Sequence, residues 1–382
     1  MKLLSTCANL VCSIALMALG GAGTALWGQA GGFAYVANCG SPCDGNMPGN
    51  LSAYTIDGAT GALTPVAGSP FPAGSVPFSV TVDPAGRFAY VANWGSHNVS
   101  AYTIDGTTGA LTPVDGSPFP AGTNPLSVTV DPADHFAYVA NGGSDNVSAY
   151  RIDSTGALTP VTGSPFPAGS VPFSVTVDPT GQFAYVANGG SNNVSAYRID
   201  STGALTPVDG SPFPAGSGPE SVTVDLTGQF AYAANTSSNN VSAYSIDGTT
   251  GALTPVDGSP FPAGTNPFSV TVDPTGQFAY VANGGSNNVS AYSIDGTTGA
   301  LMPVDGSPFP AGSNPNSVAV EPTGQFAYVT NVNSNDVSAY SIDWTSGALT
   351  PVADSPFPAG PGPESVTTTA GPPRPPAPAA RK

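Results

Sequence analysis

Short apolar segments alternate with groups of turn-forming residues along almost the whole chain. The most regular is FAYVAN at residues 33–38, which recurs six times, twice with one substitution. Its copies begin at Phe33, Phe88, Phe136, Phe183, Phe230, Phe278 and Phe326. In each copy the Phe, the Tyr and the second Ala fall on one face of a strand, and the first Ala and the Val fall on the other. Both faces are apolar, so this strand must be covered on both sides.

The copies are 47–55 residues apart, a period typical of propeller blades and other repeat arrays. The second copy contains four candidate strands, at residues 79–83, 88–92, 99–104 and 110–114. Turn-forming residues separate them: Asp83-Pro84-Ala85-Gly86 favours a type I turn, and Asp-Gly-Thr-Thr-Gly favours another tight turn. No segment has helical periodicity of useful length, so we predict an all-β fold.

Blades stacked face to face around an axis bury both surfaces of every sheet. The seven copies therefore predict a seven-bladed β-propeller with four antiparallel strands per blade. The first copy starts directly on FAYVAN and lacks the strand that precedes it elsewhere. Residues 363–367, Pro-Glu-Ser-Val-Thr, match that missing strand and have no FAYVAN after them. We expect this C-terminal segment to complete the first blade as its innermost strand and to close the ring.

The two ends of the chain differ from the repeats. Residues 1–30 contain an apolar segment from about Leu10 to Leu19 and end on Gly28-Gln29-Ala30, which is typical of a cleaved signal peptide. This segment is shorter than the ~20 residues that span a bilayer. We predict export to the periplasm or the outside of the cell, with no membrane insertion after signal removal. The propeller is expected over residues 31–370, and a disordered Pro-rich tail over 371–382.

The chain is acidic, with 7 Lys and Arg against 24 Asp and Glu and a net charge of −17 at pH 7. So few basic groups cannot neutralise many phosphates, and we therefore exclude nucleic acid and anionic lipid surfaces as partners. The blade edges are short and bounded by turns, which favours a monomer.

Outside the predicted signal peptide the chain has two cysteines, Cys39 and Cys43, in one loop. In an oxidising compartment such a pair is expected to form a disulfide. Two thiols with no His nearby in the sequence are too few ligands for a metal site. Each Asp-Gly-Thr-Thr-Gly turn offers a single carboxylate, whereas Ca²⁺ takes about 6–8 oxygen ligands. We expect no metal and no cofactor.

The succession FAYVAN, NNVSAYSID, TGALTPVDGSPF and NPxSVTVDPTGQ resembles the YVTN-type repeats of the lactonase-like β-propeller family. That family includes bacterial 6-phosphogluconolactonase-type propellers and fungal cycloisomerases that act on carboxymuconate lactones. The resemblance implies Arg, His and acidic side chains at the mouth of the central channel, directly after the Pro that leads into each inner strand. The corresponding residues here are Phe78, Leu126, Phe173, Glu220, Phe268, Asn316 and Glu364.

These positions contain neither Arg nor His. In a ring of near-copies, a specific site must use positions at which the copies differ, and we therefore predict ligand binding at the mouth. The candidate residues are Glu220, Glu364, Asn316, Phe78, Phe173 and Phe268. The acids Glu220 and Glu364 fall in the fifth and first blades, and the phenylalanines either contact a ligand or fill gaps between blades.

Five other residues also depart from the repeat and are basic. They are Arg87, His97, His135, Arg151 and Arg198. We predict that all five lie on the surface away from the mouth.

Two functions follow from this pattern. The first is an exported, non-catalytic propeller that binds a glycan or a protein partner or acts as a scaffold, since the mouth lacks basic and nucleophilic groups. The second is a hydrolase of small lactones of the 6-phosphogluconolactonase type, in which Glu220 or Glu364 acts as a general base on water.

Overall fold

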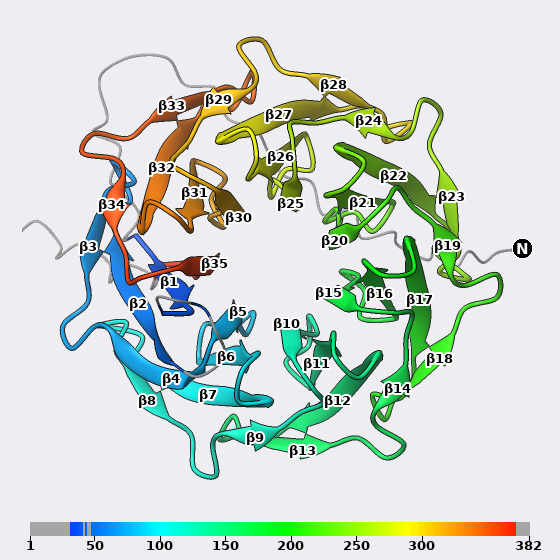
Figure 1. Ribbon diagram of the computed structural model, residues 1–382, viewed down its shortest axis with the longest axis horizontal. Coiled ribbons are helices and arrows are strands. Elements are labelled where there is room, and N and C mark those ends of the chain that lie inside the picture. The colour runs from blue at the N-terminus through cyan, green and yellow to red at the C-terminus, as the bar shows by residue number, and fades with distance from the viewer. Residues whose placement is uncertain (1–30, 41–42, 44–46, 372–382) are drawn as a thin grey trace, which may run out of the picture.

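The computed structural model describes residues 31–40, 43 and 47–371. Seven sheets stand as blades in a ring around a central channel, and the predicted seven-bladed all-β propeller is confirmed (Figure 1). Within these ranges there is no helix long and apolar enough to cross a membrane. The predicted signal peptide (1–30) and residues 372–382 of the predicted tail lie outside the described residues.

We number the blades along the chain, so that blade 1 contains β1–β4 and β35 and each later blade contains five consecutive strands. The innermost strands are β5 (Pro77–Val82), β10 (Pro125–Val130), β15 (Pro172–Val177), β20 (Pro219–Val224), β25 (Pro267–Val272), β30 (Pro315–Val320) and β35 (Pro363–Thr368). The second strands, which carry FAYVAN, are β1 (Phe33–Asn38), β6 (Phe88–Asn93), β11 (Phe136–Asn141), β16 (Phe183–Asn188), β21 (Phe230–Asn235), β26 (Phe278–Asn283) and β31 (Phe326–Asn331). The third strands are β2 (Pro48–Ile56), β7 (Asn98–Ile104), β12 (Asn146–Ile152), β17 (Asn193–Ile199), β22 (Asn240–Ile246), β27 (Asn288–Ile294) and β32 (Asp336–Ile342).

Two short strands share the outer edge of each blade. The fourth strands are β3 (Leu63–Pro65), β8 (Leu111–Pro113), β13 (Leu158–Pro160), β18 (Leu205–Pro207), β23 (Leu253–Pro255), β28 (Leu301–Pro303) and β33 (Leu349–Pro351). The fifth are β4 (Phe71–Ser75), β9 (Phe119–Pro120), β14 (Phe166–Pro167), β19 (Phe213–Pro214), β24 (Phe261–Pro262), β29 (Phe309–Pro310) and β34 (Phe357–Pro358). The fifth strand was not expected from the sequence. It forms because β8 covers only Tyr102–Ile104 of β7, and β9 pairs with Asn98 and Val99 at the other end.

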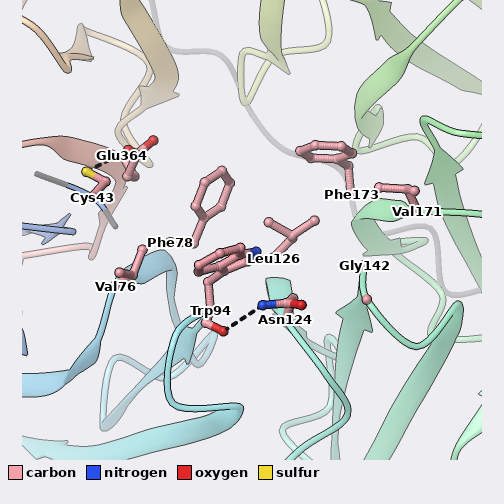
Figure 2. Close-up of a pocket in the computed structure, with 11 residues that line it drawn as sticks. Cys43, Val76, Phe78, Trp94, Asn124, Leu126, Gly142, Val171, Phe173 and Glu364 are labelled. Carbon is pink, nitrogen blue, oxygen red and sulfur yellow. Dashed lines mark hydrogen bonds between the residues drawn. The ribbon is translucent and has the colours of Figure 1, made fainter. Parts of the chain in front are cut away.

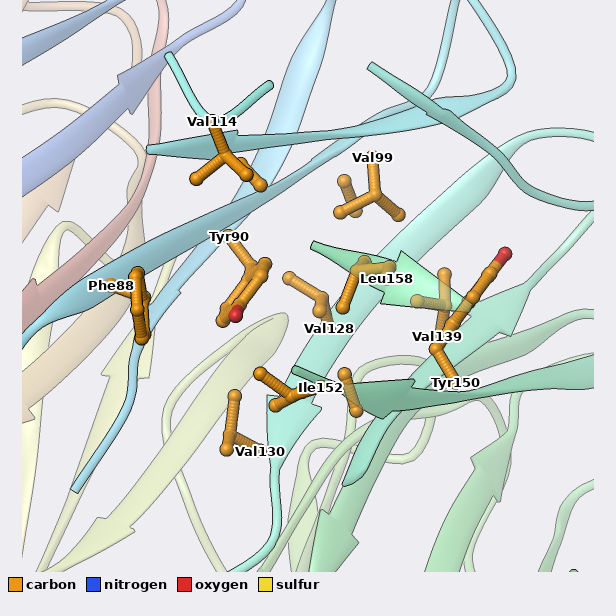
Figure 3. Close-up of a cluster of buried hydrophobic side chains, with 13 residues drawn as sticks. Phe88, Tyr90, Val99, Val114, Val128, Val130, Val139, Tyr150, Ile152 and Leu158 are labelled. Carbon is orange, nitrogen blue, oxygen red and sulfur yellow. The ribbon is translucent and has the colours of Figure 1, made fainter. Parts of the chain in front are cut away.

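The two faces of each FAYVAN strand pack against different neighbours, as the alternation predicts. Phe88 and Tyr90 of blade 2 point into a core shared with blade 3, where they contact residues such as Val128 (Figure 3). Ala89 and Val91 point the other way, into the core shared with blade 1. The hydroxyl of Tyr90 donates a hydrogen bond to a blade 3 carbonyl, that of Gly156, at 3.1 Å. Each blade therefore supplies half of two separate cores.

The C-terminal strand closes the ring as predicted. β35 pairs antiparallel with β1, with Tyr35 opposite Thr367 and Ala37 opposite Ser365. The inner strands are also joined to one another around the channel. The Val366 N–H donates to the Ser317 hydroxyl of blade 7 at 3.3 Å, and the Ser365 hydroxyl accepts the Val80 N–H of blade 2 at 3.4 Å. Equivalent serines join the other blades.

The glycine of the TGAL segment is required by this packing. Gly109 has a φ of 74°, and a Cβ there would lie 2.4 Å from Cδ1 of the buried Phe33. We expect Gly109→Ala to lower the free energy of unfolding by about 2–4 kcal/mol, because left-handed backbone strain and overpacking add. Gly106→Ala is the matched control, since a Cβ there meets nothing within 4 Å. The free energy of unfolding of Gly106→Ala, measured in urea, should stay within about 0.5 kcal/mol of wild type. Equal losses of stability in the two variants would contradict this explanation.

Candidate functional site

The predicted site residues come together because of a repeated irregularity in the inner strands. In β5, Pro77 is opposite Asn93 and Ser79 is opposite Ala92, so Phe78 is left without a partner. The same shift occurs in all seven inner strands. A bulge of this kind redirects the side chain of the extra residue. The seven bulged residues, with the serines that follow them, line one cavity of about 140 Å³ in the channel. They are Phe78, Leu126, Phe173, Glu220, Phe268, Asn316 and Glu364.

A larger cavity of about 390 Å³ opens above blades 2–4 at the mouth (Figure 2). Phe78, Leu126, Phe173 and Glu364 line it together with Trp94. Loop residues complete the lining, namely Cys43, Val76, Asn124, Gly142, Gly143 and Val171. Apolar side chains thus form the wall on one side, and the carboxyl group of Glu364 lies on the other.

Trp94 was not among the residues singled out from the sequence. It directly follows FAYVAN in the second copy. The residues at this position in the other copies are Cys39, Gly142, Gly189, Thr236, Gly284 and Val332. Comparison of the copies would have found it, as it found Arg87 and His97, because no other copy has an aromatic residue there.

Glu364 is held in place by its neighbour on the adjacent inner strand. The Nδ2 of Asn316 in β30 donates to Oε2 of Glu364 at 2.9 Å and to the Glu364 backbone carbonyl at 2.9 Å. The side chain is half-buried, and burial raises the pKa of its carboxyl group to about 7. This carboxyl group is therefore divided between its neutral and charged forms near neutral pH.

Glu220, on β20 in blade 5, has a similar environment. Burial raises the pKa of its carboxyl group to about 7. Blades 6 and 7 lie between it and Glu364. Among the described residues, neither cavity is lined by a Lys, Arg or His that would favour the charged form of either acid. The mouth therefore gains negative charge as the pH rises through 7.

The predicted disulfide between Cys39 and Cys43 is present, with the two Cα atoms 5.4 Å apart. It lies beside the channel, and the Sγ of Cys43 is 3.7 Å from Oε1 of Glu364. The two sulfurs and a Glu364 oxygen all lie within 4.8 Å of one another. A metal would require thiolates, which the joined sulfurs do not supply. The Cys43 sulfur instead contacts one oxygen of the carboxyl group.

Four of the five basic residues lie against the phenylalanine rings that begin the FAYVAN strands. The guanidinium groups of Arg87, Arg151 and Arg198 lie 4.8–5.2 Å from the centres of such rings, and His135 meets Phe136 edge-on. None of these four residues lines either mouth cavity.

His97 lies closer to the mouth than expected. Its Nδ1 accepts the backbone N–H of Asn124, a residue of the larger cavity, at 3.0 Å. In blade 4, Oδ1 of Asn192 accepts the equivalent N–H of Gly218 at 2.8 Å. His97 therefore replaces an asparagine as the acceptor that joins two blades, and its side chain is not part of the cavity wall.

A model of the family described as "Lactonase, 7-bladed beta-propeller" matches residues 21–124, 120–310 and 168–367. The chain belongs to this lactonase family. Members share the seven-bladed architecture, and the resemblance inferred from the repeats is confirmed. No curated protein sequence matches the chain.

Solved structures share the fold of this lactonase-family propeller. A candidate 6-phosphogluconolactonase from Bacteroides fragilis is 19% identical with a TM-score of 0.77, over 89% of this chain and 98% of that one. A periplasmic gluconolactonase from Pseudomonas aeruginosa is 21% identical with a TM-score of 0.75, over 89% and 100%. A Lactobacillus plantarum protein is 22% identical with a TM-score of 0.74, over 88% and 99%. At these identities the likeness extends to the fold and not to the substrate.

Proposed function

We propose that this lactonase-family propeller hydrolyses uncharged lactones at the channel mouth, with Glu364 as the general base. The observation that carries the proposal is the position of Glu364. Its carboxyl group lines both mouth cavities, is fixed by Asn316 and has a pKa of about 7. General bases work best when their pKa lies near the operating pH. The family supports the same reaction class.

The proposed reaction needs one water and no cofactor. The Glu364 carboxylate takes a proton from water, and the water oxygen bonds to the lactone carbonyl carbon. The ring C–O bond then breaks, and the leaving oxygen takes the proton back from Glu364 to give a hydroxy acid. The hydroxyl of Ser365 accepts the Val80 N–H and keeps its own proton, which it can donate to the oxygen that becomes negative.

The proposed substrate is uncharged because the mouth offers nothing to hold a phosphate or carboxylate group. Both cavities contain carboxyl groups, and among the described residues that line them there is no cation. A phosphorylated lactone would place like charges side by side, which disfavours binding. The Bacteroides fragilis protein is named for a phosphorylated substrate, 6-phosphogluconolactone. The substrate proposed here carries no phosphate.

Proton release from a panel of lactones tests the proposal. The panel contains γ-butyrolactone, δ-valerolactone, glucono-δ-lactone and 6-phosphogluconolactone. We expect turnover above the buffer rate for at least one uncharged lactone, and little for the phosphorylated one. Turnover of the phosphorylated lactone alone, or of none, would contradict the proposal.

The rate should depend on pH in the direction that the raised pKa dictates. A general base must be ionised, so kcat/KM should rise about tenfold per pH unit below 7 and level off above it. Initial rates between pH 5 and 8.5, each corrected for spontaneous hydrolysis, provide the profile. A midpoint near 4.5, the usual value for Glu, would show that a solvated carboxylate is the base instead.

The non-catalytic scaffold expected from the sequence remains a prediction. Family membership and the two mouth carboxyl groups with pKa values near 7 favour hydrolysis over it. The lactone panel distinguishes the two, since a scaffold shows no turnover of any lactone.

A further inference from the structure

The wall of the larger mouth cavity is almost wholly apolar, although it faces solvent at the channel mouth. Six side chains from blades 2–4 form this apolar wall, and they are Val76, Phe78, Trp94, Leu126, Val171 and Phe173. Figure 2 shows the aromatic rings of Phe78 and Trp94 beside one another, across the cavity from Phe173. We propose that the apolar wall binds a hydrocarbon substituent of the substrate, so that the enzyme prefers lactones that carry an alkyl or aryl group. This inference rests on the proposed function for the identity of the reacting group.

Two residues of the apolar wall are valines in a backbone conformation that disfavours valine. Val76 and Val171 have φ values of 50° and 52°. This left-handed conformation suits Gly and Asn and is strained for a β-branched residue. The other blades contain Asn or Gly at the same place, namely Asn124, Gly218, Asn266, Asn314 and Gly362. The valines therefore cost backbone strain where the repeat offers a better residue. Val171 is partly exposed and adds apolar surface to the cavity, whereas Val76 is only 3% exposed and adds little.

Trp94 is the third departure from the repeat in the same cavity. Its backbone N–H bonds to the Val76 carbonyl at 2.8 Å, and the equivalent Gly189 N–H bonds to the Val171 carbonyl at 2.9 Å. The local backbone is thus the same with tryptophan or glycine, and the indole is not needed to form the loop. The loop carbonyl of Trp94 accepts Nδ2 of Asn124 at 3.2 Å, which fixes the loop beside the cavity (Figure 2).

The composition of the apolar wall favours hydrocarbon over a polyhydroxylated ring. A cavity of about 390 Å³ is within the range of small-molecule sites, which combine apolar walls with a few polar groups. Here the polar groups are at one end, where Glu364 lies, and the apolar wall supplies few partners for sugar hydroxyls. A lactone ring at Glu364 would therefore direct its substituent along the apolar wall.

Binding of unreactive analogues tests the inference without any need for turnover. The probes are γ-lactams with alkyl chains from ethyl to octyl, measured by calorimetry, and the matching γ-lactones, measured by kcat/KM. We expect both lactam affinity and kcat/KM to rise about two- to fourfold per added methylene until the cavity is full. Trp94→Gly introduces the residue that three other blades have at this position, and it should weaken octyl-lactam binding at least about tenfold.

Two further variants separate ligand binding from folding. Val171→Asn should raise the Tm by about 1–3 °C because it removes backbone strain at a partly exposed position, and should weaken octyl-lactam binding. Val332→Gly is the control for Trp94→Gly, since it changes the equivalent position in blade 7, outside both cavities, and should leave binding unchanged.

The possible outcomes distinguish this inference from the proposed function. If lactam affinity does not depend on the length of the alkyl group, or is unaffected by Trp94→Gly, the inference is overturned even if short lactones are hydrolysed. If lactam affinity rises with alkyl length but no lactone is turned over, the proposed function is contradicted and the apolar wall is still supported as a hydrocarbon site.

Discussion

Replacing Glu364 with glutamine is expected to lower kcat for lactone hydrolysis by about 10²–10⁴-fold, the usual contribution of a general base. Glutamine keeps the shape of the side chain and can still accept the hydrogen bond from Asn316, but it cannot take a proton from water. The pH dependence centred near 7 should disappear together with the rate. Steady-state rates of wild type and Glu364→Gln on the best substrate of the lactone panel measure this effect.

Protein stability provides the control for that variant. The folded-state pKa of Glu364 is raised, so its stability contribution is fully present below pH 4.5 and is lost as the pH rises through 7. At pH 8 the glutamine variant avoids the cost of a buried charge, and its Tm should be equal to or above that of wild type. Glu220→Gln is the matched comparison, because its pKa is also about 7 but it lines only the smaller cavity. A full loss of activity in Glu220→Gln with Glu364→Gln active would reverse the two roles.

Ending the chain at Gly362 is expected to destroy the cooperative fold. This truncation removes β35, and with it the backbone pairing to β1 and the side chain of Val366 from the core between blades 7 and 1. The lost hydrogen bonds and apolar burial sum to about 5 kcal/mol or more. A domain of this kind has a net stability of only about 5–15 kcal/mol. Circular dichroism and size-exclusion chromatography should show a largely unfolded or aggregated protein at 25 °C.

A second truncation isolates the effect of β35. Ending the chain after Gly371 keeps β35 and the Thr369 contacts with Phe33, in which the Thr369 N–H donates to the Phe33 carbonyl at 2.8 Å. This form should keep the Tm of the full chain. A synthetic peptide of residues 363–371, added to the shorter truncation, should restore cooperative unfolding. If the chain that ends at Gly362 melts like wild type, the ring does not depend on β35.

Most of the fold follows from local rules that repeat. The alternation in FAYVAN requires two covered faces, the turn residues set the strand ends, and the strand missing before Phe33 is supplied by residues 363–367. Each of these depends on neighbours in sequence or on a comparison between copies, and each was found in the structure. The fifth strand was missed because Phe119-Pro120 pairs with only the end of β7 that β8 leaves free, a consequence of sheet geometry.

The mouth residues illustrate the limit of such local rules. The repeat places Glu220, Glu364 and Asn316 at the same end of their strands, which is how the sequence identified them. It does not show the burial that raises the pKa of Glu364, because the groups that contact its carboxyl group, Asn316 and Cys43, come from another blade and from the disulfide loop. It indicated Phe78 and Phe173 as mouth residues but not Val76, Trp94 and Val171, which come from separate loops and meet these rings only when blades 2–4 are side by side.

The amino-acid order alone was thus enough for the seven blades, the closure by the last strand and the disulfide, because strand alternation, turn chemistry and loop length act over a few residues. Folding in three dimensions was needed for the two mouth cavities, the near-neutral pKa of their acids and the position of Trp94. Burial and cavity shape arise from side chains that separate blades bring into contact, and these contacts follow from the packing around the channel.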